Sequence, residues 1–318
     1  MSKIKIDLPE SCAISILRSL AMVSIVTCHI LQATNNKYCW LFNIGVQVFL
    51  AISGYLNGRK YIENWIYWAK KRLNKLYVPY ITFILICFIF YYIFAPNNIN
   101  VKSVVIHILD LQGLVSSANI SGLSHLWFMS IIAICYIITP ILQFVRKYNI
   151  LIPVFIVISI LNFFIFKICV VPFSWLFVYI MGYMYGASTI FWKRRITVFV
   201  SCLFIWLSLF ISWEDILDYQ NIINQLFHAM SGLFAIIFTI ILFKRFNITL
   251  KNKIISTTDK YSYEIYLVHH VFILGPFSLM TITGNLFINI SSIIVLTFLC
   301  SIILNYISSK ICSYINNK

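Results

Sequence analysis

Charged side chains are scarce in this sequence. Only 10% of its 318 residues are charged and only nine are acidic, whereas 61% are hydrophobic. A soluble chain of this length needs a far more polar surface, so the composition excludes one. Apolar runs long enough to cross a hydrocarbon core recur along the whole length, which predicts a polytopic membrane protein.

Further absences narrow the class. Short alternating strands are missing, which excludes a transmembrane barrel and leaves helices as the expected element. The nine cysteines contain no C-x-x-C pair, so we interpret them as small apolar residues and not as a disulfide or metal framework. The net charge of +15 comes without a basic stripe interleaved with stacking aromatics, so nucleic-acid binding is not expected. The first apolar region is too long for a cleaved signal peptide.

The predicted fold is therefore all-α, a single transmembrane domain over residues 1–318 with about ten membrane-spanning helices. We place the spans at 12–33, 41–57, 77–95, 124–144, 149–167, 172–189, 196–213, 222–243, 262–281 and 287–308. Segment 100–112 is different, because its apolar residues fall on one helical face. It is predicted to be a helix lying flat on the membrane.

The basic residues predict the orientation. With a cytoplasmic N-terminus, 20 of the 24 Lys and Arg residues fall on the inner side, as the positive-inside rule requires. An even number of spans then places the C-terminus in the cytoplasm as well. Arg59 and Lys60 are interpreted as topology signals only. The expected location is the cell (inner) membrane.

Two polar residues stand out in the first predicted span, Arg18 and His29. Eleven residues of α-helix turn back to within about 20° of the start and rise about 16 Å, so both share one face. Each alone could be an interfacial or packed residue, but together they favour a face turned to a hydrated cavity. A neutral histidine can act as a base near pH 7. The simplest use is to deprotonate a hydroxyl that attacks an activated acyl group.

Five segments in order resemble the membrane acyltransferase-3 family, which transfers acyl groups from acyl-coenzyme A to hydroxyls, chiefly of bacterial surface polysaccharides. The first segment is Arg, ten residues, then His in the first span. The others are GVQVFLAISGYL (45–56), WAKKRLNKLYVPY (68–80), SHLWFMSIIAICYIITPIL (124–142) and YSYEIYLVHHVFI (261–273). The third is similar to the family's basic loop before the third span.

The resemblance implies roles for particular residues. His29 would be the base and Arg18 its partner, while Arg72, Lys75 and Lys71 would bind the phosphates of the donor, acetyl-CoA. The residues implied to line or shape the substrate site are Ser53, Gly54, His125, Trp127, Tyr266 and His269. No metal is implied. The acceptor would be a surface polysaccharide or a lipid-linked oligosaccharide.

Several of these residues also have plainer interpretations. Ser53 and Gly54 suit close helix packing, and Trp127 suits an aromatic belt. His270, next to His269, is expected to point elsewhere and to be structural. His107 and Asp110 lie three apart on segment 100–112 and are not assigned to the site.

The sequence departs from the family pattern at Lys75, Ile132 and Ser15. Lys75 replaces an arginine and so offers a point charge in place of a fork. Ile132 stands where one large branch carries a glutamate. This indicates the branch similar to the enterobacterial common antigen acetyltransferase and the intercellular-adhesin acyltransferases.

Two other functions remain open from the residues. A transporter or flippase for lipid-linked glycans would spread ionisable residues over several spans. A non-catalytic scaffold would not need Arg18 and His29 on one face. The transferred acyl group has two open alternatives, acetyl and succinyl.

Overall fold

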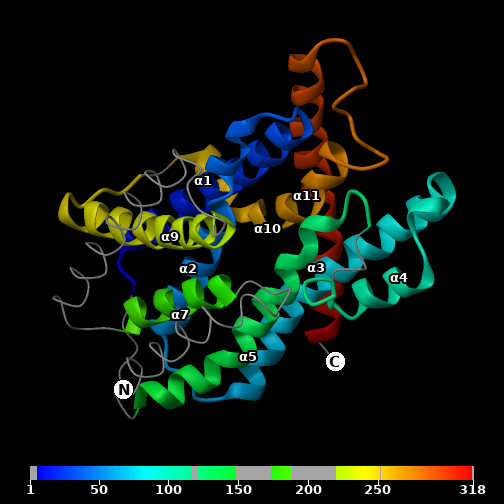
Figure 1. Cartoon of the computed structure of the whole chain (residues 1–318). Coiled ribbons are helices and arrows are strands. Elements are labelled where there is room, and N and C mark those ends of the chain that lie inside the picture. The colour runs from blue at the N-terminus through cyan, green and yellow to red at the C-terminus, as the bar shows by residue number, and fades with distance from the viewer. Residues whose placement is uncertain (1–5, 116–119, 148–172, 188–219, 251, 317–318) are drawn as a thin grey trace. The chain divides into compact units, whose positions relative to one another are not determined.

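The computed structural model describes residues 6–115, 120–147, 173–187, 220–250 and 252–316 (Figure 1). Every regular element in these ranges is helical, which confirms the all-α prediction for them. The chain divides into two compact units. The first contains residues 1–24, 43–62 and 131–259, and the second contains residues 25–42, 63–130 and 260–318.

The long helices follow the predicted apolar runs, with shifted ends. They are α1 (Leu8–Ala33), α2 (Gly45–Gly58), α3 (Trp65–Phe94), α5 (Trp127–Lys147), α7 (Phe173–Ala187), α9 (Gln220–Arg245), α10 (Lys253–Ile273) and α11 (Leu286–Asn316). Short pieces are the α-helix α4 (Val101–Ile108) and the 3₁₀ helices η1 (Lys37–Phe42), η2 (Pro96–Asn98) and η4 (Ser124–Leu126).

Six helical segments in the described ranges are long and apolar enough to cross a membrane. They match the predicted spans 12–33, 41–57, 77–95, 124–144, 222–243 and 287–308. Spans 172–189 and 262–281 correspond to α7 and α10, which are not among the six. Spans 149–167 and 196–213 lie outside the described residues.

In the first unit, α2 and α7 pack with their backbones in close contact. A Cβ atom on Gly54 would overlap the carbonyl oxygen of Tyr179, and one on Gly182 would overlap that of Ala51. Glycines four residues further along each helix, Gly58 and Gly186, make equivalent contacts. Small residues four apart allow such an approach, so the packing role expected for Gly54 is confirmed.

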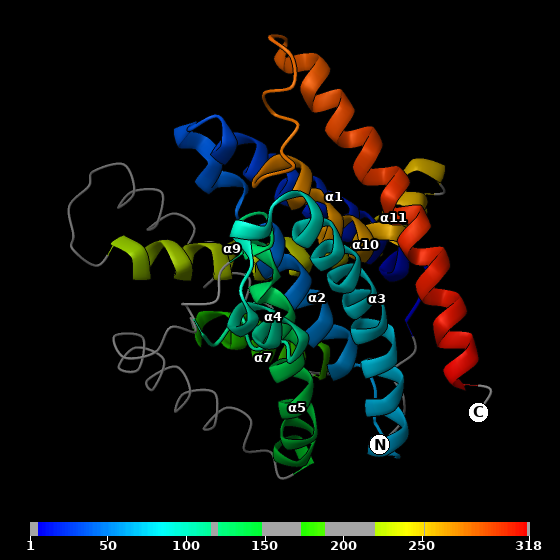
Figure 2. The same cartoon turned by 90° about the vertical axis from the view of Figure 1, so that its right-hand side faces the viewer.

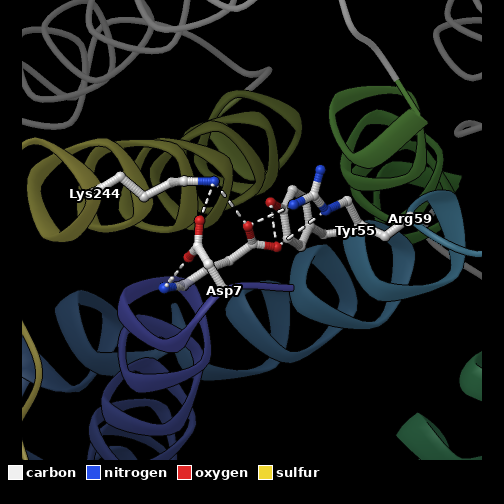
Figure 3. Close-up of polar contacts among 5 residues, drawn as sticks. Asp7, Tyr55, Arg59 and Lys244 are labelled. Carbon is white, nitrogen blue, oxygen red and sulfur yellow. Dashed lines mark hydrogen bonds and ion pairs between the residues drawn. The ribbon is translucent and has the colours of Figure 1, made fainter. Parts of the chain in front are cut away.

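A buried ionic network joins α1, α2 and α9 of the first unit (Figure 3). The fully buried carboxylate of Glu10 accepts hydrogen bonds from Arg59 Nη2 at 2.6 Å and Nε at 3.0 Å. Tyr55 Oη and Lys244 Nζ donate to it as well, and Lys244 also pairs with Asp7. The prediction that Arg59 serves topology only is wrong, because its side chain is buried and ion-paired.

In the second unit, α3 and α11 run side by side (Figure 2). The predicted basic loop before the third span is wrong: α3 begins at Trp65, so Lys71, Arg72 and Lys75 are helical. The Asn64 side chain caps its first turn by accepting the Tyr67 N–H. This cap, followed by residues with good helix propensity, starts the helix twelve residues before the apolar run predicted.

Helix α4 confirms a helix in segment 100–112, but it ends at Ile108 and packs on α3. Tyr80 and Tyr77 of α3 donate their hydroxyl protons to the carbonyls of His107 and Ile108. The buried residues of α4 are Ser103, Ile106 and His107. The side of α4 that packs on α3 is therefore not the apolar face that the sequence predicts to lie on the membrane, and that orientation stays a prediction.

Both ends of α10 differ from the predicted span 262–281. The helix runs from Lys253 to Ile273, so it starts nine residues before the predicted span and stops eight residues before its end. Asn252 caps the start through the N–H groups of Ile254 and Ile255. Gly275, at φ +112°, and the following proline end it, because neither continues an α-helix.

Candidate active site

Three segments of the second unit bring four histidine rings together. His29 comes from α1, His125 from η4, and His269 and His270 from α10. The ring centroid of His29 lies 5.2 Å from that of His269 and 4.6 Å from that of His270. The His125 ring lies 5.1 Å from His269 and stacks on His270 at 4.5 Å. We call these four residues the histidine cluster.

Hydrogen bonds between η4 and α10 hold the cluster in place. The Tyr266 hydroxyl donates to the His125 carbonyl, and the His125 ring Nε2 donates to the Leu267 carbonyl at 3.1 Å. His270 Nδ1 donates to the Gly122 carbonyl at 2.9 Å. Gly122 has φ +84°, and a side chain there would meet the Leu274 carbonyl, so this turn needs glycine.

The same bonds assign the ring protons. A carbonyl oxygen only accepts, so a ring nitrogen that faces one carries the proton and leaves the lone pair on the other nitrogen of a neutral ring. His269 Nδ1 faces the carbonyls of Ile265 and Tyr266. The lone pairs therefore lie on Nε2 of His269 and His270 and on Nδ1 of His125.

The side chains that carry these lone pairs are buried. His125, His269 and His270 are 3%, 0% and 3% exposed, and neither His125 Nδ1 nor His269 Nε2 has a hydrogen-bond partner. A buried acceptor without a donor costs about 1–3 kcal/mol of free energy, which a ligand with hydrogen-bond donors would recover. The cluster is thus a set of hydrogen-bond acceptors suited to ligands that donate.

His29 is the more open member, half-buried at the edge of the cluster. Its Nδ1 lies 2.7 Å from the side-chain oxygen of Gln32. An amide oxygen also only accepts, so the His29 lone pair lies on Nε2, where it can take a proton. The described residues contain no group of three or more His, Cys, Asp or Glu side chains placed to hold a metal ion, and this includes the histidine cluster.

The remaining predicted site residues lie in different places. Tyr266 and His125 are in contact, with ring centroids 5.2 Å apart, while half-buried Trp127 packs edge-on against Phe128. Arg18 and Ser53 belong to the first unit. Arg18 pairs there with Asp259 at 3.2 Å, and Ser53 Oγ donates to the Tyr136 hydroxyl at 3.3 Å.

The predicted donor-binding residues lie in the first half of α3. Lys71 and Lys75 are exposed, and half-buried Arg72 lies over the Trp68 ring, 5.8 Å from its centroid. On one helix, residues 71 and 75 are four apart and point the same way, one turn from each other. The three cations therefore form a compact basic stretch suited to phosphate groups.

A second polar group lies where α4 ends. Asp110, at φ +54°, accepts hydrogen bonds from Gln112 Nε2 at 2.9 Å and Ser130 Oγ at 3.2 Å. Burial raises the pKa of the Asp110 carboxyl to about 7, although both hydrogen bonds favour the ionised form. The bonds tie the turn after α4 to the start of α5.

The structure adds His270 and Gln32 to the residues found by sequence. The expectation that His270 points away is wrong, because its ring lies between those of His29 and His125. Side chains of neighbouring residues on a helix point about 100° apart. His269 and His270 can still both belong to the cluster, because its other rings come from two further segments. Gln32 could have been found from its i+3 spacing to His29.

The comparisons with known proteins agree with the resemblance in the sequence. No curated protein and no solved structure matches the chain. A family model described as an acyltransferase domain matches residues 13–306, which is most of the sequence and includes the whole histidine cluster. The chain therefore belongs to the membrane acyltransferase-3 family.

Proposed function

We propose that this acyltransferase moves an acyl group, most simply acetyl, from cytoplasmic acyl-CoA to a hydroxyl of a cell-surface or lipid-linked polysaccharide. His29 is the general base. The observation that carries the proposal is the His29 ring at the open edge of a buried cluster of hydrogen-bond acceptors. Family membership supplies the acyl transfer, and the ring geometry supports the choice of base and the hydroxyl acceptor.

His29 takes up the proton that the acceptor hydroxyl loses and later passes it to the leaving thiolate. Its Nε2 takes the proton of the acceptor hydroxyl as the oxygen attacks the thioester carbonyl carbon. A C–O bond forms, the C–S bond breaks with its electron pair on sulfur, and the proton returns to the thiolate. General base assistance of this kind typically contributes 10²–10⁴-fold to the rate.

The other three histidines suit an acceptor with several hydroxyls. Their lone pairs accept hydrogen bonds and donate none. They therefore complement hydroxyl groups, which can donate, and disfavour carbonyl or carboxylate groups, which only accept. The buried nitrogens of His125 and His269 gain a partner only when such a group enters. A sugar, which carries hydroxyls on adjacent carbons, has the required chemistry.

The acyl donor would bind to the basic stretch of α3. Arg72, Lys75 and Lys71 on α3 would hold the phosphates of coenzyme A, with Arg72 forming a fork and the lysines acting as point charges. The positive-inside rule places this basic stretch in the cytoplasm, where acyl-CoA is found. The expected location of the protein is then the cell membrane.

Substitution of His29 tests the proposal. Cells carrying His29→Ala should lose the ester-linked acyl groups of their surface polysaccharide, measured by nuclear magnetic resonance, while the amount of polysaccharide stays unchanged. Thr34→Ala is the control, because the exposed Thr34 hydroxyl bonds only to carbonyls of the last turn of α1, which it directly follows.

Two outcomes contradict the proposal. Loss of the polysaccharide itself from the surface indicates a transporter or flippase, whose defect is in export. Unchanged esters with normal levels of the variant in the membrane rule out His29 as the base and leave a scaffold.

A further inference from the structure

The side chain bonded to the proposed base is an amide. Gln32 lies three residues after His29 on α1, one helical turn away, and its Oε1 is 2.7 Å from His29 Nδ1. Gln32 is exposed, so this contact is not needed to fill a core. Bases in acyl-transfer sites need a third group that sets the tautomer and orientation of the imidazole.

We propose that Gln32 is the positioning residue of His29, whose Nδ1 proton it accepts so that the lone pair stays on Nε2. This inference rests on the proposed role of His29 as the base. Gln32 is not part of the segments that resemble the acyltransferase-3 family, and it acts on the substrate only through the imidazole of His29.

The histidine cluster makes this positioning necessary. His269 and His270 of α10, and His125 of η4 behind them, each present a lone pair. A neutral imidazole has two tautomers, and the tautomer with its proton on Nε2 is the one that turns this nitrogen into a donor for such acceptors. In that tautomer Nε2 has no lone pair and cannot take a proton from a hydroxyl.

Gln32 works against that tautomer. The hydrogen bond from His29 Nδ1 to its amide oxygen is kept only when the proton is on Nδ1. When His29 takes the hydroxyl proton, the same bond becomes charge-assisted and therefore stronger. Gln32 thus stabilises the reacting tautomer before the step and the imidazolium during it.

A neutral amide also differs from a carboxylate in a measurable way. Replacing it by a carboxylate would keep the acceptor but add a negative charge within hydrogen-bond distance of the imidazolium. A nearby opposite charge favours the charged form of a base, so the group would hold its proton up to a higher pH. Replacing it by an apolar side chain would remove the acceptor altogether.

The experiment uses membranes containing the full chain and its native polysaccharide, with radiolabelled acetyl-CoA as the probe and labelled polysaccharide as the readout. Gln32→Leu should lower the maximal rate by about 10–100-fold, as losses of orienting groups do in other sites, with the KM for acetyl-CoA unchanged. Gln32→Glu should keep the rate within a few-fold at alkaline pH. The midpoint of its acid limb should move up by about one pH unit.

Three results would overturn the inference. Wild-type activity of Gln32→Leu shows that the contact is dispensable. A Gln32→Glu variant as inactive as Gln32→Leu at every pH shows that the amide donates to His29 or only packs. A raised KM for acetyl-CoA with an unchanged maximal rate shows an effect on donor binding.

Failure of this inference is separable from failure of the proposed function. His29→Ala, measured in the same membranes, should be inactive. If it still labels the polysaccharide, the base has been misassigned and the proposed function fails. If it is inactive while Gln32→Leu is normal, the base stands and only the role of Gln32 is rejected. Thr34→Ala remains the control, because Thr34 lies near the same helix end.

Discussion

The buried ionic network of the first unit makes a strong prediction about stability. Glu10 is fully buried, and Arg59 is only 6% exposed. Glu10→Ala removes the carboxylate that accepts two hydrogen bonds from Arg59, one from Tyr55 and one from Lys244. The guanidinium then stays in a buried place without its counter-charge, which is the costly way to break an ion pair.

The expected loss is large. Removing one member of a buried ion pair costs about 3–5 kcal/mol, most of it from the charge left behind. At roughly 2–4 °C per kcal/mol for a domain of 150–250 residues, the melting temperature should fall by roughly 6–20 °C. The assay is the loss of the monodisperse peak on size-exclusion chromatography after heating the detergent-solubilised protein.

Two further variants show whether the charge is the cause. Asp7→Asn removes only a half-exposed partner of Lys244 and should cost less than about 1 kcal/mol. The double variant Glu10→Leu, Arg59→Met removes both charges and should recover most of the loss. The reasoning is refuted if Glu10→Ala melts with the wild type, or if the double variant is no more stable than Glu10→Ala.

Two other predictions concern stability. Burial raises the pKa of Asp110 from 3.8 to about 7, so between these pH values the folded protein binds a proton that the unfolded chain does not, and stability falls as pH rises. Between pH 5 and the folded-state pKa lie about two pH units, so at 1.36 kcal/mol per unit the free energy of unfolding should fall by about 3 kcal/mol from pH 5 to pH 8, and Asp110→Asn should abolish this fall; an equal fall in the variant contradicts the assignment. Gly54→Ala should cost about 1–3 kcal/mol in the same melting assay, because its Cβ overlaps the Tyr179 carbonyl oxygen, whereas Gly284→Ala, with open space around it, should change little; equal melting of both variants would show that the α2 and α7 backbones separate easily.

The composition was enough to predict the class of protein. With 61% hydrophobic and 10% charged residues, the chain cannot cover a soluble surface, and long apolar runs in lipid become helices. The ends of the helices were harder to predict. Asn64 and Asn252 cap α3 and α10 well before the apolar runs begin, because a helix continues into water once its first turn is capped.

The family was also legible in the sequence, because the motifs are local and keep their order. The spacing of Arg18 and His29 drew attention to α1, yet the partner found for Arg18 is Asp259, 241 residues away in sequence. Arg59 appeared to be one more topology charge until its pairing with Glu10 was seen. Long-range pairs of this kind leave no periodic signal, because each member sits in its own local pattern.

By itself, then, the sequence determined that this is a helical membrane protein of the acyltransferase-3 family, because hydropathy and local motifs are properties of neighbouring residues. Only the tertiary structure decided that four histidines meet and that His270 is among them. It also decided where their lone pairs lie, because a ring's tautomer depends on which carbonyl or amide oxygen the fold places beside it.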